Sequence, residues 1–333
     1  MRITQEILLK IANDTVAKRT RKDRSLLSVY LHGSLLEEAF LLGGTTDIDL
    51  VFIHDNNPQV NREIEALTDE VHLDIAHHSR SEYQDTRTLR LHPWLGPTIV
   101  GCKILYDPQH FMDFTQASVG GQFYRPDFVL ERGRGMVEHG RQIWFSLHVM
   151  ADEPDLDDFS LYLKAVEHVV NGIASLSGPP LTERRFLVNF PERAEAVGKP
   201  GLYPGLLGLL GGANVKVDLL RACLDDWIAA CEAIPTAEVP ISLHPGRRGY
   251  YKQAFETLLS GERPHDLLWP LLRTGTCAVQ KLPEGKDEAN NWHKRLEDLG
   301  LKGAGFHQRV AALDVYLDTV EETLEAWARQ HGA

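Results

Sequence analysis

The sequence has 333 residues, of which 43% are hydrophobic and 25% charged, and its formal net charge at pH 7 is −12. This length suffices for two domains with their own cores, and no apolar run approaches the roughly 18 residues of a membrane span. A protein that grips a long polyanion needs a basic surface, so the acidic balance disfavours nucleic acid as a partner. Four cysteines without Cys-x-x-Cys spacing, and the lack of a signal-peptide core, predict a cytoplasmic protein without membrane association.

Hydrophobic periodicity predicts a compact mixed α/β domain over residues 1–115, with a small sheet and helices. In chain order, the predicted elements are a helix at 3–20, a strand at 26–32, a helix at 35–42, a strand at 47–53, an amphipathic stretch at 58–70, a strand at 71–76, and a strand that starts at 103 and ends at a proline. The strands are short and apolar, which is typical of elements buried in a core.

Three acids on two of these strands form the first candidate site. Asp47 and Asp49 are two residues apart, so on a strand both side chains point to the same face. If the strand at 71–76 pairs beside theirs, Asp74 reaches the same edge of the sheet. Like charges held together at the end of a buried strand repel each other, and a divalent cation would relieve that repulsion. Oxygen-only ligands on rigid strands favour Mg²⁺, and three acids can hold two ions.

The turn Gly33-Ser34 is the second candidate site. Gly33 lets the backbone approach a ligand closely, and the helix predicted to follow would offer free N–H groups to a phosphate. The Ser34 hydroxyl can either cap that helix or bind a phosphate oxygen. An isolated Gly-Ser is usually only a turn, but its position between two strands, next to the acids, favours a combined magnesium and phosphate site.

The order Gly-Ser, Asp-x-Asp and a lone acid on a later strand resembles the DNA polymerase beta-type nucleotidyltransferase superfamily. The segments Tyr30-Leu31-His32-Gly33-Ser34 and Thr46-Asp47-Ile48-Asp49-Leu50-Val51 are similar to those of the aminoglycoside adenylyltransferases in particular. The resemblance covers roughly residues 25–107. It implies a nucleotidyltransferase catalytic domain at 1–115, followed by a helical domain.

This resemblance implies specific roles for the candidate residues. Asp47 and Asp49 would bind the metal, Asp74 would bind metal or act as the base, and Gly33 and Ser34 would hold the outer phosphates of a nucleoside triphosphate. The implied reaction is Mg²⁺-dependent transfer of a nucleoside monophosphate, AMP from ATP, to a hydroxyl of a small acceptor, with release of pyrophosphate. Because an acidic cleft attracts amines, a small cationic acceptor is favoured.

Residues 116–333 predict an all-α domain, because strand patterns vanish from Pro126 onward and a 3.6-residue periodicity takes over. The predicted helices span 127–150, 157–176, 181–197, 214–233, 248–261, 265–281 and 305–330. We expect this domain to complete the nucleotide and acceptor site.

Within the helical domain, Lys164 is the candidate ligand of the triphosphate. It shares a predicted helix face with His168, four residues later, and by the resemblance it would contact the phosphates. The alternative is an ordinary solvated face. Two further basic stretches, 184–185 and 246–252, fit a phosphate site or a charged helix start equally well and are left unassigned.

Two other functions remain open. Some members of the superfamily modify or bind a partner protein, as antitoxin-type proteins do, and others act on transfer RNA. A protein-directed module predicts a shallow cleft with an apolar rim, whereas a transfer-RNA enzyme predicts a basic track that the net charge disfavours. A homodimer in which two chains complete one site is also left open.

Overall fold

The structure is a computed structural model that describes residues 3–149, 154–283 and 285–333. Its internal contacts divide the chain into two compact units, one of Met1–Arg125 with His244–Ala254 and one of Pro126–Leu243 with Phe255–Ala333. The first unit extends past the expected boundary at residue 115. It also includes a segment from more than a hundred residues further along the chain, which the sequence did not suggest.

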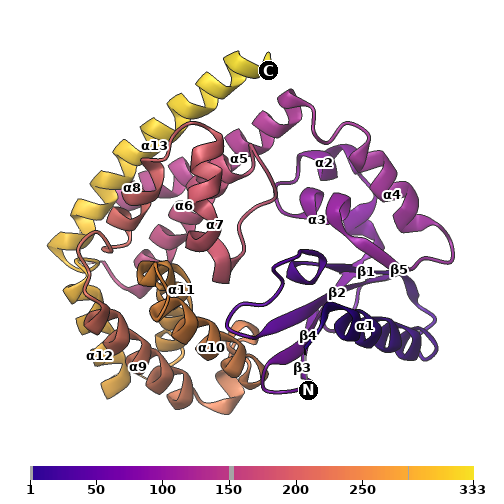
Figure 1. Ribbon diagram of the computed structural model, residues 1–333, viewed down its shortest axis with the longest axis horizontal. Helices are drawn as coiled ribbons and strands as arrows, with labels where there is room; N and C mark the ends of the chain where they lie inside the picture. The colour runs from indigo at the N-terminus through magenta and orange to yellow at the C-terminus, as the bar shows by residue number, and fades with distance from the viewer. Residues whose placement is uncertain (1–2, 150–153, 284) are drawn as a thin grey trace. The chain divides into compact units, whose positions relative to one another are not determined.

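The first unit is built on a small mixed sheet (Figure 1). Its strands are β1 Leu26–His32, β2 Thr46–His54, β3 Arg62–Ala66, β4 Val71–Ser79 and β5 Lys103–Tyr106. The strand order is β3-β4-β2-β1-β5; β2 and β4 run parallel, and every other neighbouring pair is antiparallel. The four strands predicted from the sequence are confirmed, while β3 lies in the stretch expected only to be amphipathic.

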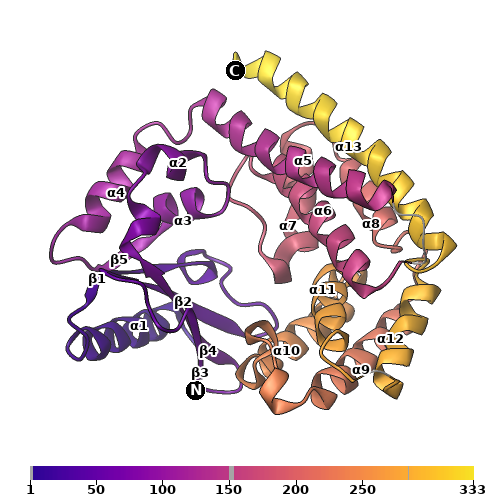
Figure 2. The same cartoon turned by 180° about the vertical axis from the view of Figure 1, so that it is seen from behind.

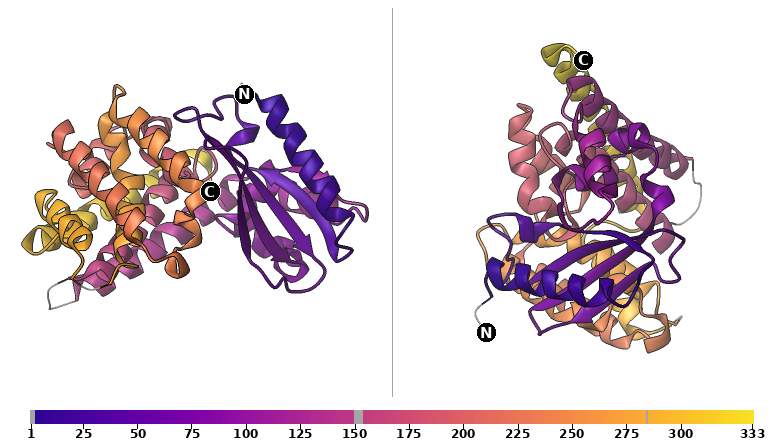
Figure 3. Two further views of the ribbon diagram at one scale, coloured as in Figure 1. Left: turned by 90° about the horizontal axis from the view of Figure 1, so that it is seen from below. Right: turned by 90° about the vertical axis from the view of Figure 1, so that its right-hand side faces the viewer.

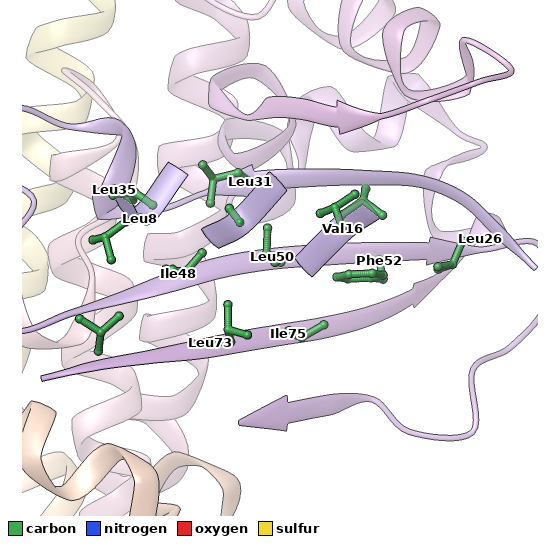
Figure 4. Packing of buried hydrophobic residues seen from close by; sticks show 13 residues of the cluster. Leu8, Val16, Leu26, Leu31, Leu35, Ile48, Leu50, Phe52, Leu73 and Ile75 are labelled. Carbon is green, nitrogen blue, oxygen red and sulfur yellow. The ribbon is translucent and has the colours of Figure 1, made fainter. Parts of the chain in front are cut away.

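One face of the sheet is covered by helix α1, Gln5–Thr20 (Figure 3). The Thr4 side chain caps this helix by accepting from the backbone N–H of Ile7. Figure 4 shows Leu8 and Val16 of α1 beside Leu50 and other apolar residues of the sheet, and all of these side chains are buried. Alternate residues of β2 and β4 therefore form a continuous core on this side.

The opposite face carries a second, smaller core. Helices α2 Thr86–Leu91, α3 Leu95–Gly101 and α4 Phe111–Gly120 lie on the side of β1 and β5 (Figure 2). They contribute apolar residues that pack with Tyr30 of β1 and with Val51 and Ile53 of β2. The sequence did not predict these three helices. This core covers Tyr30 of β1 and Val51 and Ile53 of β2. The part of the same face that carries Asp47 and Asp49 is left for polar side chains.

The helix predicted from Leu35 to Leu42 is wrong. Only a three-residue 3-10 turn forms, at Ser34–Leu36, and Glu37 is already extended with φ −99° and ψ 157°. Two consecutive glycines end the loop with φ of +64° and +73°, values that suit glycine alone. The apolar side chains of the segment pack against the sheet core instead of forming a helix face. No helix N-terminus therefore follows Gly33, and that part of the predicted phosphate cradle is absent.

The remainder of the chain is helical, as expected. Its helices are α5 Pro126–His148, α6 Leu156–Ala174, α7 Phe186–Ala196, α8 Leu202–Leu209, α9 Val217–Ala233, α10 Arg248–Leu259, α11 Leu268–Val279, α12 Asp287–Asp298 and α13 Ala304–His331. Each of the seven predicted helices has a counterpart here, although the last residue predicted for 127–150 lies outside the described residues; α8 and α12 were not predicted. Across the described part of the chain, no helix combines the length and apolarity needed to cross a bilayer.

Close packing of α5 against α6 gives a stability prediction. A Cβ added at Gly172 of α6 would overlap the side chain of Val137 and lie 3.1 Å from the carbonyl oxygen of Gly133, both on α5. Because valine is stiff in a helix, we expect Gly172→Ala to lower the free energy of unfolding by about 1–3 kcal/mol. Gly135→Ala on α5 is the matched control: its added Cβ meets nothing within 4 Å, and better helix propensity should stabilise by roughly 0.5–1 kcal/mol. Urea unfolding of both variants checks this, and equal effects would contradict it.

Candidate functional site

The three predicted acids lie on adjacent, parallel strands. β4 pairs in parallel with β2, and the Cα of Asp74 is directly opposite that of Asp49, while Asp47 is opposite His72. Registered neighbours on paired strands project their side chains to the same face, so the acids share one side of the sheet. The predicted pairing of the two strands is thus confirmed. On the other side of β2, His32 of β1 is opposite Asp49.

Asp47 lies in a small polar and aromatic group. The hydroxyl of Tyr250 donates to Asp47 Oδ2 at 2.7 Å, and the Tyr250 ring meets the His72 ring edge-on with centroids 4.7 Å apart. Asp47, His72 and Asp74 each offer a ligand atom, and these atoms all lie within 4.8 Å of one another. Tyr250 belongs to the segment His244–Ala254, which Thr45 also holds by donating to the Tyr250 carbonyl at 3.2 Å.

Asp74 is held by arginines. The Arg62 guanidinium donates from Nε to Oδ1 at 2.6 Å and from Nη2 to Oδ2 at 2.7 Å, which is a bidentate, charge-assisted pair. Nη2 of Arg247 is 3.5 Å from Asp74 Oδ2. The hydrogen bond to Asp74 raises the pKa of Arg62. The carboxylate itself is buried, so these contacts supply the charge compensation that water cannot.

Asp49 lies against the backbone of Gly33. Gly33 has φ +80°, and a Cβ added to it would overlap Oδ2 of Asp49, so only glycine lets the carboxylate occupy this position. Burial, followed by the charges of Asp47 and Asp74, raises the pKa of Asp49 well above its usual range. Burial also lowers the pKa of the neighbouring His32 to about 4, so this imidazole is neutral at pH 7.

These residues fit a divalent cation. Burial, and after it the negative charges of Asp47 and Asp74, raise the pKa of Asp49, and a cation beside these carboxylates would offset both effects. The oxygens of Asp47 and Asp74 are close enough together to bind one ion. His72 departs from the all-oxygen set that the sequence predicted, because an imidazole nitrogen suits Mn²⁺ and other transition metals better than Mg²⁺.

The two remaining predicted residues, Ser34 and Lys164, belong to different units of the chain. The Ser34 hydroxyl is 3.4 Å from that of Thr46, within the turn that follows Gly33. Lys164 is exposed on α6 in the helical unit, where its carbonyl oxygen is 2.9 Å from Nδ1 of His168. Its predicted contact with phosphate stays a prediction.

Four residues of the site were not singled out from the sequence: His72, Arg62, Arg247 and Tyr250. His72 precedes Asp74 by two residues, so the alternation rule that joined the aspartates would also have found it. The stretch 246–252, with aromatics among basic residues, was noticed but not assigned. No sequence pattern pointed to Arg62, because the stretch that forms β3 was expected only to be amphipathic and not to be a strand.

No protein-family model matches this chain, and no curated protein matches it. What the protein does is therefore inferred from its own residues.

Proposed function

We propose that this protein is a nucleotidyltransferase of the DNA polymerase beta type, which transfers a nucleoside monophosphate, AMP from ATP, to a hydroxyl of a small acceptor. The observation that carries the proposal is the convergence of Asp47, Asp49 and Asp74 on one face of two parallel strands, against the glycine that precedes Ser34. A Gly-Ser turn, an Asp-x-Asp strand and a third acid in register resemble the nucleotide and metal site of that superfamily.

The roles of the chain's residues follow from their positions. Asp47 and Asp74, whose ligand atoms lie close to one another and to His72, would hold Mg²⁺, and Asp49, opposite Asp74 on β2, would add a third carboxylate. The bound cation would neutralise phosphate oxygens and stabilise charge on the attacking and leaving oxygens. The backbone at Gly33, which bears no side chain of its own and lies against Asp49, would approach the outer phosphates, with the Ser34 hydroxyl beside it.

The reaction balances without a further reactant. The acceptor hydroxyl oxygen forms a bond to the α-phosphorus, and the bond to the β-phosphate oxygen breaks to release pyrophosphate. A carboxylate of the cluster takes the hydroxyl proton. Most of the rate gain would come from positioning the reactants and from charge neutralisation.

A small acceptor is favoured over nucleic acid by charge. The chain has 47 acidic and 35 basic residues, so a polyanion would meet net repulsion. An acceptor that carries amines as well as hydroxyls, as aminoglycosides do, has the complementary charge.

The test is a transfer assay with the full chain. We expect incubation with each ribonucleoside triphosphate, Mg²⁺ and a panel of aminoglycosides and simpler amino alcohols to yield an acceptor whose mass increases by one nucleoside monophosphate, together with pyrophosphate. EDTA should abolish both products. Nucleotide attached to a co-incubated protein instead would favour the protein-modifying alternative. If no panel member is modified and calorimetry detects no Mg²⁺-dependent binding of any triphosphate, the proposal is wrong.

A further inference from the structure

Two guanidinium groups contact the acid that would bind the cation. Arg62 holds both oxygens of Asp74 at 2.6 and 2.7 Å, and Arg247 approaches one of them at 3.5 Å. A cation that took Asp74 as a ligand would therefore lie next to two positive charges. Like charges at such distances repel strongly when water is largely excluded.

The local charge is nearly balanced without a cation. The carboxylates of Asp47, Asp49 and Asp74 carry at most three negative charges, so the two guanidinium groups leave at most one of them uncompensated. A divalent ion added alone would overcompensate it, whereas an ion that arrives with a polyphosphate brings negative charge of its own. Guanidinium groups bind phosphate with the same planar, two-point geometry with which they bind a carboxylate.

Arg247 has a buried hydrogen-bond donor that makes no hydrogen bond within the described residues. Its side chain is 9% exposed, and among the described residues its Nε has no hydrogen-bond partner. The rings of Tyr250 and Tyr251 lie 5.7 and 5.6 Å from its guanidinium carbon and hold it in place. A buried donor without a partner is costly, and an anionic ligand would satisfy it.

Arg62 is the more exposed of the two arginines. It lies on β3, the edge strand, and its side chain is 43% exposed. It can therefore turn from Asp74 towards a ligand without disturbing the core. Arg247 can therefore bind a phosphate in the position that it already occupies, whereas Arg62 can turn from Asp74 to contact that phosphate.

We infer that the polyphosphate of the nucleotide competes with Asp74 for the guanidinium groups of Arg62 and Arg247, and that a cation gains Asp74 as a ligand only once the nucleotide has drawn them away. This rests on the proposed function. The two arginines are then triphosphate-binding residues, and the carboxylate they release completes the metal site. Nucleotide and metal would bind interdependently rather than in either order.

The competition predicts opposite effects of one substitution on two separate affinities. We expect Arg62→Gln to bind Mn²⁺ alone more tightly than wild type, by about tenfold or more, because a positive charge beside the ion is removed. The same variant should bind the α,β-methylene analogue of ATP, in EDTA and without metal, about tenfold more weakly. Electron paramagnetic resonance of free Mn²⁺ measures the first affinity and calorimetry the second. Separating the two ligands avoids chelation of metal by the nucleotide.

Three further variants complete the design. Arg62→Lys keeps the charge and should leave Mn²⁺ binding close to that of wild type. Arg247→Gln should shift both affinities in the same directions as Arg62→Gln, which gives an independent second test. Arg19→Gln is the matched control, because Arg19 pairs with Glu63, the residue next to Arg62, and should change neither affinity. Circular dichroism verifies that each variant is folded.

The outcomes separate this inference from the proposed function. If wild type transfers nucleotide but folded Arg62→Gln and Arg247→Gln bind Mn²⁺ no more tightly than wild type, the competition is refuted and the proposed function stands. If neither wild type nor any variant binds Mn²⁺ or the analogue, both are refuted. Opposite shifts in both arginine variants, with Arg19→Gln unchanged, would support the competition.

Discussion

Replacing Asp49 by asparagine is expected to slow nucleotidyl transfer severely while making the metal-free protein more stable. Asp49 shares one face of the sheet with Asp47 and Asp74, and burial, followed by these two charges, raises its pKa. The asparagine side chain has the same shape but no charge, so it removes the repulsion between residue 49 and the other two carboxylates. It also removes one carboxylate ligand of the metal. Loss of one preorganised charged group in a site of this kind costs about a hundred- to a thousandfold in rate. The transfer assay and thermal unfolding in EDTA measure the two effects.

The opposite signs of these effects make the prediction specific. Replacing a residue that only supports the fold lowers the activity and the stability of the protein together. The control is Asp55→Asn, at the exposed residue that follows the same strand and pairs with Arg80 at 3.1 Å. It should change the rate little, and the midpoint of unfolding little, because surface ion pairs contribute at most about 1 kcal/mol. Full turnover by Asp49→Asn would exclude the proposed reaction at this site.

The strands of the sheet could be predicted from the sequence where they are largely buried. β1, β2 and β4 are rich in apolar residues, because both of their faces are buried over most of their length. β3 reads Arg-Glu-Ile-Glu-Ala, with charges on both faces, because it is an edge strand with little buried surface. The helix expected after Gly33 is wrong for the converse reason. Its segment is apolar because its leucines pack against the core of the sheet, but they do so from a loop.

The acids of the site could be predicted because spacing along one strand fixes a shared face. Asp47 and Asp49 needed only the two-residue period, and Asp74 needed in addition that its strand pair beside theirs. The arginines that compensate the charge of these acids have no such spacing pattern in the sequence. Arg247 and Tyr250 reach the sheet from a segment far along the chain. A contact of that range is set by tertiary packing, which no local pattern encodes.

Replacing Gly33 by alanine is expected to disable the site and destabilise the fold. Gly33 has φ +80°, which costs an alanine roughly 1–2 kcal/mol, and the added Cβ would overlap Oδ2 of Asp49. Either the turn shifts or the carboxylate leaves its position, so Mn²⁺ binding and transfer should both fall by about tenfold or more. Gly44→Ala is the matched control: its φ is +73°, but nothing lies within 4 Å of its added Cβ. It should lose only the conformational free energy and retain Mn²⁺ affinity.

A double-mutant cycle separates the overlap with Asp49 from backbone strain. Asp49→Ala removes the carboxylate, so in its presence Gly33→Ala should lower the free energy of unfolding by no more than Gly44→Ala does, roughly 1–2 kcal/mol. In the presence of Asp49 the cost should be larger, and the difference is the coupling between the two residues. Urea unfolding of the four proteins in EDTA gives each value. Equal costs of Gly33→Ala with and without Asp49 would mean that the carboxylate does not lie against this turn, and the phosphate and metal parts of the site would then be separate.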